Sequence, residues 1–518
     1  MNVSRTVYPV VDIFAGPGGL GEGFASLDEG TGKPRFESVA SIEHDEHSHR
    51  TLHLRHFLRT FQEGFPDEYY QYLNGSLSLE HLYSRFPENR SHADATALRI
   101  SLGPESHEKV RQLISARLGG KGKWALVGGP PCQAYSLVGR SRMMGDPDFA
   151  SDVRHRLYRE YLKIIIDHAP PVFVMENVKG LLSSKIDGEL TIKLILADLA
   201  KPKEAVDGGA NGLGYRLFAL SEAEIPGPDA DPRMFLIRAE EFGVPQARHR
   251  MFIVGIREDI SVSPGKLKPH KSPTLRQTIE TLPPIRSGLS RAIDSFEAWS
   301  KEIEGFDPPS VRQCIHEHGY AGDLFDAASS EVVRVPSGQL RRRSTSYPAQ
   351  TVTRHPALDY IYDSRLDTLD GHEARAHMAS DLRRYAFAAS FASITGKSPK
   401  LADFPQELLP AHQNVELGRE GKMFADRFRV QLPDQPSTTI TSHISKDGHY
   451  FIHYDPSQCR SLTVREAARL QTFPDNYKFE GPRTAQYHQV GNAVPPYLAS
   501  QIAAIIAEVL DRMRDGDN

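Results

Sequence analysis

One cysteine occupies a position that core packing explains poorly. Cys132 lies in "GGPPCQAYS", directly after glycines and prolines that interrupt strands and helices alike. A thiol just past the end of a strand is accessible, and its thiolate is a nucleophile. The two prolines fix the backbone in front of it and would aim the side chain. The stretch therefore indicates a nucleophilic cysteine, with a packing role as the alternative.

A carboxyl group and two guanidinium groups follow at similar places. Glu176 ends the apolar run of "PPVFVMENV", and Arg248 and Arg250 lie in "QARHR", which leads into another apolar run. Each of these charged side chains, taken singly, could simply face water. Together with Cys132 they supply a nucleophile, an acid and an electrostatic stabiliser, which are the groups of nucleophilic catalysis.

The elements that must position these groups alternate between apolar strands and amphipathic helices. Strands are expected at residues 6–16, 37–45, 123–131, 170–178 and 249–257. Helices are expected at residues 152–169, 189–200, 461–474 and 496–513, the last packed on the sheet. Alternation of this kind predicts a parallel α/β sheet, in which ligands bind at the carboxyl ends of the strands.

A glycine-rich loop follows the first expected strand. In "DIFAGPGGLGEGF", Gly16, Gly18 and Gly21 fit the G-x-G-x-x-G pattern of nucleotide-binding turns. Glu43 ends the second strand, where a carboxylate could bind a ribose diol. Both NAD and S-adenosylmethionine fit this arrangement, and a tight turn without a ligand is the alternative.

Composition sets the limits on the class of protein. The chain has 518 residues, 39% of them hydrophobic and 25% charged, which is typical of a globular protein with two or more domains. No apolar run of about 20 residues and no signal peptide is apparent, so we expect no membrane association. The three cysteines and the lack of a CxxC pair predict a reducing, cytoplasmic compartment and no metal site.

The amino-acid composition changes after residue 258, where proline, lysine and serine become frequent. The net charge of −4 does not favour nucleic acid, but residues 332–354 carry five arginines and no acidic residue. That segment includes Arg341, Arg342 and Arg343, and a solvated loop is the alternative reading. Residues 347–355 and 435–443 resemble each other, over a length too short to define a repeat.

In order and spacing, these motifs resemble those of the cytosine-C5 DNA methyltransferases of bacterial restriction–modification systems. "DIFAGPGG", "GGPPCQAYS", "ENV", "QARHR", "REAARLQTFP" and "QVGNAVPP" occur in family order across residues 8–258 and 436–498. The resemblance implies a Rossmann-like, S-adenosylmethionine-dependent methyltransferase fold: a mixed α/β sheet with helices on both faces, plus a smaller, irregular target-recognition domain. It implies a catalytic domain at 1–258, the recognition domain at 259–475, and a segment at 476–518 that returns to the catalytic domain.

For catalysis, the resemblance implies that the Cys132 thiolate adds to C6 of cytosine, which activates C5 toward a methyl sulfonium. Glu176 would hydrogen-bond N3 and the exocyclic amine, and Arg250 would hold O2. Arg248 would support the loop that carries Cys132. The acceptor of the C5 proton is not identified, and water is one possibility.

The cofactor implied is S-adenosylmethionine. Phe14 would stack on the adenine, Gly16 and Gly18 would approach the methionine part, and Glu43 would bind the ribose. Asp94 is the candidate for the adenine amine. The remaining cofactor candidates come from the catalytic loop and the last motif: Pro131, Asn492 and Val494.

The implied partner is double-stranded DNA, from which the target base must flip out. Ser136 and Arg140 lie in the loop after Cys132, which would close over DNA; Val138 departs from the small polar residue usual in the family. The arginines at 341–343 would contact phosphates or guanine edges. We expect a monomer and no stable complex with a cognate restriction endonuclease encoded nearby.

Three other functions remain open. A tRNA cytosine-C5 methyltransferase has the same fold, but those chains have little between the base-binding and closing motifs. A nicotinamide-dependent oxidoreductase would explain the glycine loop and leave Cys132, Glu176 and "QARHR" unexplained. A non-catalytic DNA-binding homologue would not need the complete set of catalytic residues.

Overall fold

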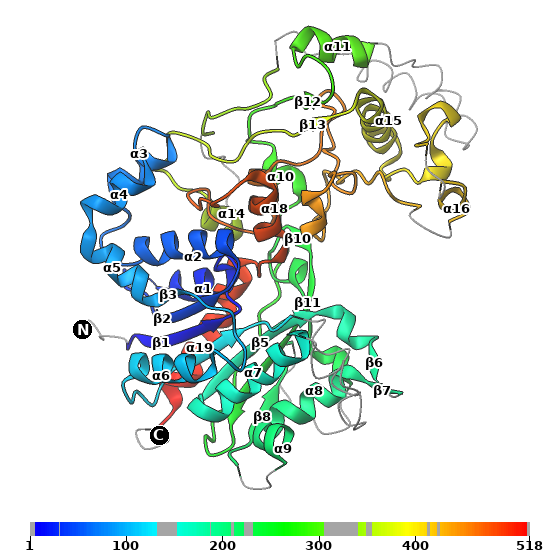
Figure 1. The fold of residues 1–518 in the computed structure, drawn as a ribbon. Helices are drawn as coiled ribbons and strands as arrows, with labels where there is room; N and C mark the ends of the chain where they lie inside the picture. The colour runs from blue at the N-terminus through cyan, green and yellow to red at the C-terminus, as the bar shows by residue number, and fades with distance from the viewer. Residues whose placement is uncertain are drawn as a thin grey trace.

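The computed structural model has a lower lobe built around one sheet and an upper, more irregular lobe (Figure 1). The residues that the structure describes are 6–28, 30, 32–131, 153–186, 188–208, 212–221, 231–304, 340–348, 355–411, 415–421 and 425–514. Cys132, Ser136 and Arg140 lie outside the described residues, so the hypotheses about them stay predictions.

The central sheet has eight strands. They are β1 (Tyr8–Ile13), β2 (Phe36–Glu43), β3 (Ala97–Arg99), β4 (Ala125–Gly128), β5 (Val172–Val178), β8 (Tyr215–Phe218), β9 (Leu236–Arg238) and β11 (His249–Arg257). The order is β3-β2-β1-β4-β5-β11-β8, with β9 paired to β11. The five expected strands are confirmed, but β11 runs antiparallel to β5 and β8, so the sheet is mixed rather than all-parallel.

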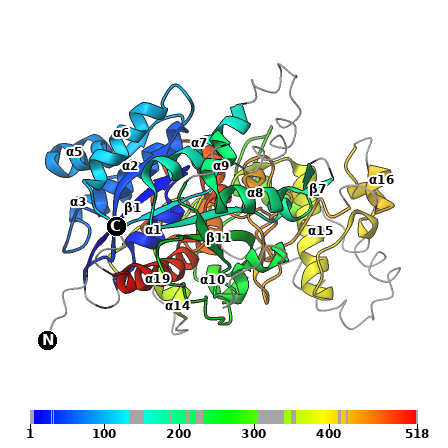
Figure 2. The ribbon, with the colours of Figure 1, turned by 90° about the horizontal axis from the view of Figure 1, so that it is seen from below.

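Helices cover both faces of the sheet (Figure 2). On one face lie α1 (Gly19–Ala25) and α19 (Pro496–Arg512), and on the other lie α6 (His107–Leu118), α7 (Val153–His168) and α8 (Thr191–Ala200). Successive residues of a strand point to opposite faces, so Val10 packs in the first layer and Val11 in the second. Residues 483–512 are long and apolar enough to span a membrane, but 72% of their apolar window is buried in the fold, as in a core helix.

Between β2 and β3 the chain makes a helical excursion that the sequence did not predict. It consists of α2 (Glu46–Leu58), α3 (Asp67–Leu73), α4 (Leu79–Arg85) and α5 (Pro87–Thr96). Aromatic side chains form its core; Phe57, for example, contacts Phe61 and Tyr83 edge-on, with ring centroids 5.3 and 5.0 Å apart. Its helix α3 lies nearest the upper lobe (Figure 1).

The upper lobe has short elements around a second core that includes Trp299 and Phe387. Helices α11 (Phe296–Glu304) and α15 (Ala379–Thr395) line this core, α16 (Val415–Arg419) lies in the same lobe, and β12 (Gly288–Leu289) pairs with β13 (Ala376–His377). Helix α10 (Leu275–Ile279) packs in a separate core with Leu462 and Tyr487. Helix α14 (Pro356–Ile361) contacts the lower lobe, where Tyr360 lies against Ser26 and Tyr497. The lobes meet where β10 (Gln246–Ala247) pairs with β14 (Ser437–Thr438), beside η7 (Ser442–Ser445), α17 (Val464–Leu470) and α18 (Arg483–Asn492). The remaining short elements are β6 (Lys185–Ile186), β7 (Glu189–Leu190), α9 (Pro202–Asp207), η2 (Lys179–Leu182), η3 (Pro232–Phe235), η4 (Ala239–Glu241), η5 (Leu401–Asp403) and η6 (Gln406–Leu408).

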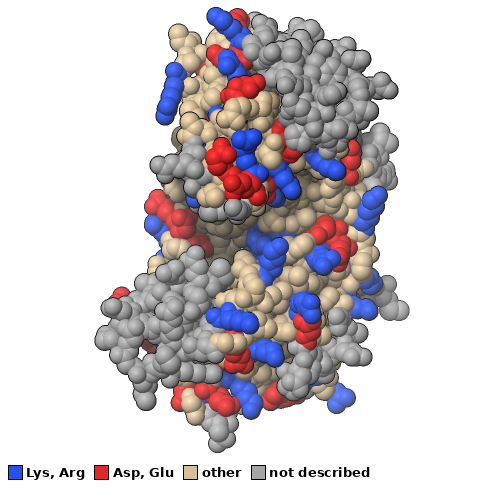
Figure 3. All heavy atoms as spheres, turned by 90° about the vertical axis from the view of Figure 1, so that its right-hand side faces the viewer, with Lys and Arg blue, Asp and Glu red and all other residues tan. Residues whose placement is uncertain are grey.

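A hollow crosses one face of the molecule between the two lobes, and Lys and Arg side chains lie at its edge (Figure 3). The carboxyl ends of the parallel strands lie on the side of the sheet that faces the junction of the two lobes (Figure 1). The fold therefore brings the strand ends, where sequence analysis put the chemistry, toward the junction of the lobes.

Candidate active site

Glu176 and Arg250 meet at the edge of the sheet. Glu176 lies near the end of β5, and Arg250 lies at the start of the antiparallel strand β11, where it pairs in register with Val178. Because β11 runs antiparallel, its first residues lie beside the last residues of β5. The Arg250 Nε atom is 3.0 Å from Glu176 Oε1. Burial raises the pKa of the Glu176 carboxyl above its ordinary value, and the guanidinium groups of Arg250 and Arg248 oppose that rise.

The loop that leads to Cys132 is built against this pair. A Cβ atom added to Gly129 would lie 2.9 Å from Glu176 Oε2 and 3.0 Å from the Glu176 carbonyl oxygen, so a larger residue there would displace the Glu176 carboxyl group. The Asn177 side-chain amide, 3% exposed, donates a hydrogen bond of 2.8 Å to the Pro130 carbonyl oxygen. The "ENV" segment thus holds the base of the predicted catalytic loop as well as supplying the carboxyl group.

Arg248 has a different environment from the one expected. Its guanidinium is buried and donates to three backbone carbonyl oxygens, those of Ile440 at 2.8 Å, Gly491 at 3.2 Å and Ala493 at 2.8 Å. These contacts join β11 to the start of η7 and to the end of α18. Among the described residues Arg248 therefore connects three chain segments, whereas Arg250 contacts the Glu176 carboxyl group.

A glutamine pair at the same junction was missed by the sequence analysis. The Gln246 amide donates to Gln471 Oε1 at 2.5 Å and accepts from the Ile440 backbone N–H at 2.8 Å. The Gln471 amide donates in turn to the carbonyl oxygens of Val490 and Ala493. Buried amides that satisfy one another in this way fix the relative position of the motifs.

The glycine loop has the geometry of a ligand site. Phe14 and Gly16 both have φ of +57°, a left-handed conformation that is unusual for phenylalanine and leaves its ring partly exposed. The space where a Gly16 side chain would lie is open, whereas at Gly18 a Cβ would come within 2.9 Å of Leu52 Cδ1 and 3.2 Å of Tyr477 Oη. Gly16 therefore leaves room for a ligand, and Gly18 lets the loop pack closely.

The Glu43 carboxylate anchors this loop. It accepts hydrogen bonds from the backbone N–H groups of Gly16 at 2.8 Å, His44 at 2.8 Å and Asp45 at 2.7 Å. Burial alone would raise the pKa of Glu43, but these hydrogen bonds and His44 lower it. Glu43 is thus held as a carboxylate at the end of β2, in position for a ribose diol.

The structure does not bring Asp94 to this edge. Asp94 lies in α5, before β3 begins at Ala97, and β3 runs parallel to β2. Glu43 pairs with Arg99, the last residue of β3, whereas Asp94 lies before the first residue of β3. The Asp94 carboxylate is exposed and lies 2.8 Å from the Nε2 atom of His53.

Asp12 is a site candidate that the sequence analysis missed. It lies in β1 directly before the glycine loop, is 1% exposed, and neither carboxylate oxygen has a hydrogen-bond partner among the described residues. Burial raises the pKa of Asp12 to about 7, and the Arg59 guanidinium opposes the shift. The letter D before "IFAG" was the available signal, but burial without a partner is visible only in the fold.

The C-terminal segment closes the glycine loop from behind. A Cβ at Gly19 would lie 2.4 Å from the Val494 carbonyl oxygen, and Tyr477 donates a hydrogen bond of 2.5 Å to the Pro17 carbonyl oxygen. Asn492 is exposed at the end of α18, and Val494 is buried. Pro131, which follows β4 in the sequence, is also exposed. Tyr477 and Val494, which come from the last part of the chain, thus contact the glycine loop.

The residues at this edge fit S-adenosylmethionine. Phe14 offers a partly exposed ring for a base, Glu43 a carboxylate for a ribose, and Gly16 open space beside the backbone. Asp12 adds a buried carboxyl group in β1 near the Arg59 guanidinium.

The three arginines at 341–343 do not share one environment. Arg342 donates to the Ala374 carbonyl oxygen at 2.9 Å and lies 3.3 Å from Glu373 Oε1. Arg341 and Arg343 are exposed, line a pocket of about 610 Å³ with Ser344, and have no side-chain partner among the described residues. The alternation follows from the extended backbone, whose side chains point to opposite sides in turn.

The fold and the site together define a methyltransferase of the Rossmann-like class. Residues 121–508 match the C-5 cytosine-specific DNA methylase family. The chain belongs to this family and is a DNA (cytosine-5-)-methyltransferase.

Relatives extend the likeness to the first 120 residues. The chain is 32% identical over 527 residues to the type II methyltransferase M.Bpa9945I of Bacillus paralicheniformis, which covers 97% of this chain and 99% of that protein. It is 26% identical to the type II methyltransferase M.AgeI of Thalassovita gelatinovora, across 96% and 98% of the two chains. In fold it is similar, with a TM-score of 0.52 and 18% identity over 98% and 100% of the chains, to a protein described as a prophage-encoded DNA modification methyltransferase (E. coli).

Proposed function

We propose that this enzyme methylates C5 of a flipped-out cytosine in a specific duplex DNA sequence, through a covalent adduct between Cys132 and C6. The observation that carries the proposal is the contact between Glu176 and Arg250, at 3.0 Å, beside the loop that leads to Cys132. An acid and a guanidinium so placed can hold N3 and O2 of one pyrimidine ring.

The chemistry assigns one task to each side chain. The Cys132 thiolate forms a bond to C6 while the Glu176 carboxyl group hydrogen-bonds N3 and shares a proton with it. Arg250 stabilises the charge that develops at O2. S-adenosylmethionine supplies the methyl group. C5 takes up that group, a base removes the C5 proton, and the electron pair restores the double bond as the bond to Cys132 breaks.

The cofactor is held by the glycine loop in this proposal. Phe14 stacks on the adenine, Glu43 binds the ribose, and Gly16 and Gly18 form the backbone wall. Asn492 and Val494 close the pocket. Asp94 remains a hypothesis for the adenine amine that its position in α5 does not favour.

DNA reaches the site through the hollow between the lobes, and residues 259–475 provide target recognition. The biological role we propose is protection of DNA from a cognate restriction endonuclease, since the relatives M.Bpa9945I and M.AgeI are named type II methyltransferases. Arg341 and Arg343 contact the DNA backbone. Arg342 supports the segment from within, because its guanidinium is already paired.

The decisive experiment is bisulfite sequencing of DNA from cells that express the protein. We expect complete methylation of cytosine at one sequence, and none in cells that express Cys132→Ala. Parallel assays on purified DNA and tRNA separate this function from the tRNA alternative. Methylation by the Cys132→Ala variant, or transfer to tRNA alone, would overturn the proposal.

A further inference from the structure

The first helix of the excursion, α2, faces the glycine loop with three side chains. Leu52 and Arg55 in α2 and Arg59 directly after it are three and four residues apart, so they project from one face. A Cβ atom at Gly18 would come within 2.9 Å of Leu52 Cδ1, and both guanidinium groups reach Glu22 on helix α1. The excursion therefore contacts both the glycine loop and the helix that follows it.

The Arg55 and Glu22 side chains form a buried ion pair. Arg55 Nη2 lies 2.5 Å from Glu22 Oε1, Arg55 Nε lies 3.2 Å from Oε2, and Arg59 Nη2 lies 2.9 Å from the same Oε2 atom. Burial alone would raise the pKa of the Glu22 carboxyl, but the two guanidinium groups lower it to about 2, so Glu22 is a carboxylate at neutral pH. Helix α1, which begins where the glycine loop ends, is thereby fixed against α2.

The Arg55 guanidinium reaches the loop by a second route, through Tyr477. Its Cζ atom lies 4.4 Å from the centre of the Tyr477 ring, a cation–π distance, and its Nη1 atom donates a hydrogen bond of 3.3 Å to Asn476 Oδ1. The Tyr477 hydroxyl donates a hydrogen bond of 2.5 Å to the Pro17 carbonyl oxygen. Pro17 lies between the two glycines that form the wall of the proposed cofactor site.

The glycine loop depends on groups outside it for its conformation. Phe14 has a φ of +57°, a left-handed conformation that is costly for a residue with a side chain and persists where the surroundings fix it. Glu43 fixes the Gly16 backbone N–H at 2.8 Å, and Tyr477 fixes the Pro17 carbonyl oxygen. A displacement of either partner would let the loop relax.

We propose that Arg55 is a positioning residue for S-adenosylmethionine, because it holds the glycine loop in its binding conformation through Glu22 on α1 and through Tyr477 behind Pro17. A loop that already has its bound conformation loses less entropy when the ligand binds, which raises the affinity. The helical excursion then contributes to cofactor affinity from behind the loop. The inference rests on the proposed cofactor site and adds to it a residue outside the six motifs.

Calorimetric titration of the full chain with S-adenosylmethionine, without DNA, tests this role. Arg55→Lys keeps a charge beside Glu22 but loses the planar group over the Tyr477 ring, so it should raise the Kd by about tenfold. Tyr477→Phe removes the hydrogen bond to Pro17 and should raise the Kd by about five- to tenfold. Because Arg55 acts through Tyr477, the double variant should also show a rise of about tenfold, rather than the roughly fifty- to hundredfold rise of two independent effects.

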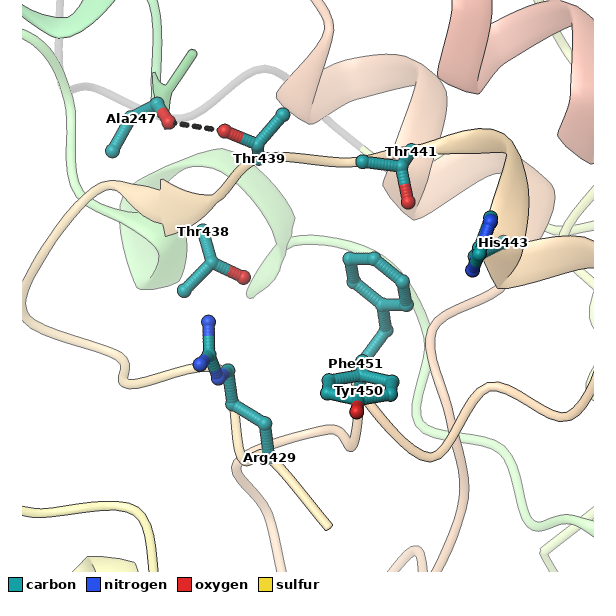
Figure 4. Close-up of a pocket in the computed structure, with 8 residues that line it drawn as sticks. All are labelled: Ala247, Arg429, Thr438, Thr439, Thr441, His443, Tyr450 and Phe451. Atoms are coloured by element: carbon teal, nitrogen blue, oxygen red, sulfur yellow. Dashed lines mark hydrogen bonds between the residues drawn. The ribbon is translucent and has the colours of Figure 1, made fainter. Parts of the chain in front are cut away.

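Two controls separate positioning from general support of the fold. Arg460→Lys alters an equally buried pair, in which Arg460 donates two hydrogen bonds of 2.7 Å to Glu466. It should lower the melting temperature and leave the Kd unchanged. Thr439→Val removes a contact between the lobes, the hydrogen bond of 2.6 Å to the Ala247 carbonyl oxygen (Figure 4), and should likewise leave the Kd unchanged.

An unchanged Kd in Arg55→Lys, beside a wild type that binds S-adenosylmethionine, would overturn the inference alone. Multiplied effects in the double variant, or an equal rise of the Kd in either control, would also overturn it. A wild type that does not bind S-adenosylmethionine would instead overturn the proposed cofactor site.

Discussion

The Asn177 side-chain amide donates a hydrogen bond of 2.8 Å to the carbonyl oxygen of Pro130. This bond ties the end of β5, where Glu176 lies, to the loop that leads to Cys132. The side-chain oxygen of Asn177, Oδ1, accepts a hydrogen bond of 2.9 Å from the Val178 backbone N–H. The side-chain amide is therefore held at both its nitrogen and its oxygen. The proposed nucleophile and acid are therefore positioned from one strand end.

Replacing Asn177 by Ala should lower kcat by about 10- to 100-fold, because a small displacement of a reacting group is costly. The KM for S-adenosylmethionine should stay within about twofold, since the glycine loop is separate. Steady-state kinetics and a thermal melt check both statements. Asn89→Ala serves as a control, because Asn89 bonds Thr60 in the helical excursion. Equal losses in the two variants would contradict a positioning role for Asn177.

Gly129→Ala should abolish most of the activity and leave the fold intact. The added Cβ would meet Glu176 Oε2 at 2.9 Å and force the carboxyl group away from its place. We expect a loss of about 100-fold or more in kcat/KM. Gly103→Ala is the control, because nothing lies within 4 Å of its Cβ position. The idea fails if Gly129→Ala retains full activity in a methyl-transfer assay.

Arg248 and Arg250 should behave differently on substitution. Arg248→Ala leaves the carbonyl oxygens of Ile440 and Gly491 without a side-chain donor, while Gln471 still donates to Ala493, so it should destabilise the protein by about 2 kcal/mol or more. Arg250→Ala should keep its melting temperature within a few degrees and lose methyl transfer. Thermal unfolding and activity, measured on both proteins, decide the assignment. A stable, inactive Arg248→Ala protein would return Arg248 to the catalytic group.

His372 should make the stability of the upper lobe depend on pH. It is buried between the Thr463 hydroxyl at 3.1 Å and the Pro283 carbonyl oxygen at 2.8 Å, which together satisfy the neutral ring. Burial lowers the pKa of His372 to about 4, while Glu466 opposes the shift. In the unfolded chain the pKa is about 6.5. The unfolded state therefore binds more protons, and stability is fully present above pH 6.5 and falls as the pH decreases toward 4.

This histidine should contribute a slope of up to about 1.4 kcal/mol per pH unit in that window. Chemical denaturation at several pH values measures the slope. His372→Gln removes one titrating group and should reduce the slope by up to about 1.4 kcal/mol per pH unit. A substituted protein with the same pH dependence as the wild type would show that other groups account for it. His453, whose pKa burial lowers to about 3, adds to the slope in both proteins.

Residues whose role depends on the end of a strand were predictable. Glu176 ends an apolar run and Arg250 precedes one, and because β11 runs antiparallel to β5 both residues lie at one edge of the sheet. The acceptors of Arg248, at Ile440, Gly491 and Ala493, could not be predicted, because they come from distant segments that no local pattern connects to it. The contact set of a buried guanidinium is a property of tertiary packing.

Asp94 and the excursion around it show another limit. A helix that is buried on most sides has no amphipathic pattern, and α2 buries polar Thr51, Arg55 and His56 beside its leucines. The helices of the excursion and the start of β3 were therefore not predicted, and the candidate Asp94 lies in α5. Short strands such as β9, and turns fixed by tertiary contacts, escape sequence reasoning for the same reason.

The helical excursion also makes a contact with the upper lobe that should affect DNA binding. The Arg365 guanidinium donates to the Phe65 carbonyl oxygen at 2.5 Å, pairs with Asp67 at 2.6 Å and lies over the Tyr70 ring. Tyr70 in turn donates to Asp363 at 2.8 Å. These contacts join α3 to the upper lobe and limit the opening between the lobes at one end.

Arg365→Ala should raise the KM for DNA several-fold and leave the KM for S-adenosylmethionine unchanged, because a looser joint lowers the fraction of molecules with the lobes correctly spaced. Amide hydrogen exchange should increase together in residues 65–73 and 363–366. Arg85→Ala is the matched control, since Arg85 pairs with Glu68 inside the excursion at 3.0 Å and does not reach the upper lobe. If Arg85→Ala changes the KM for DNA as much as Arg365→Ala does, the contact between the lobes is not the cause.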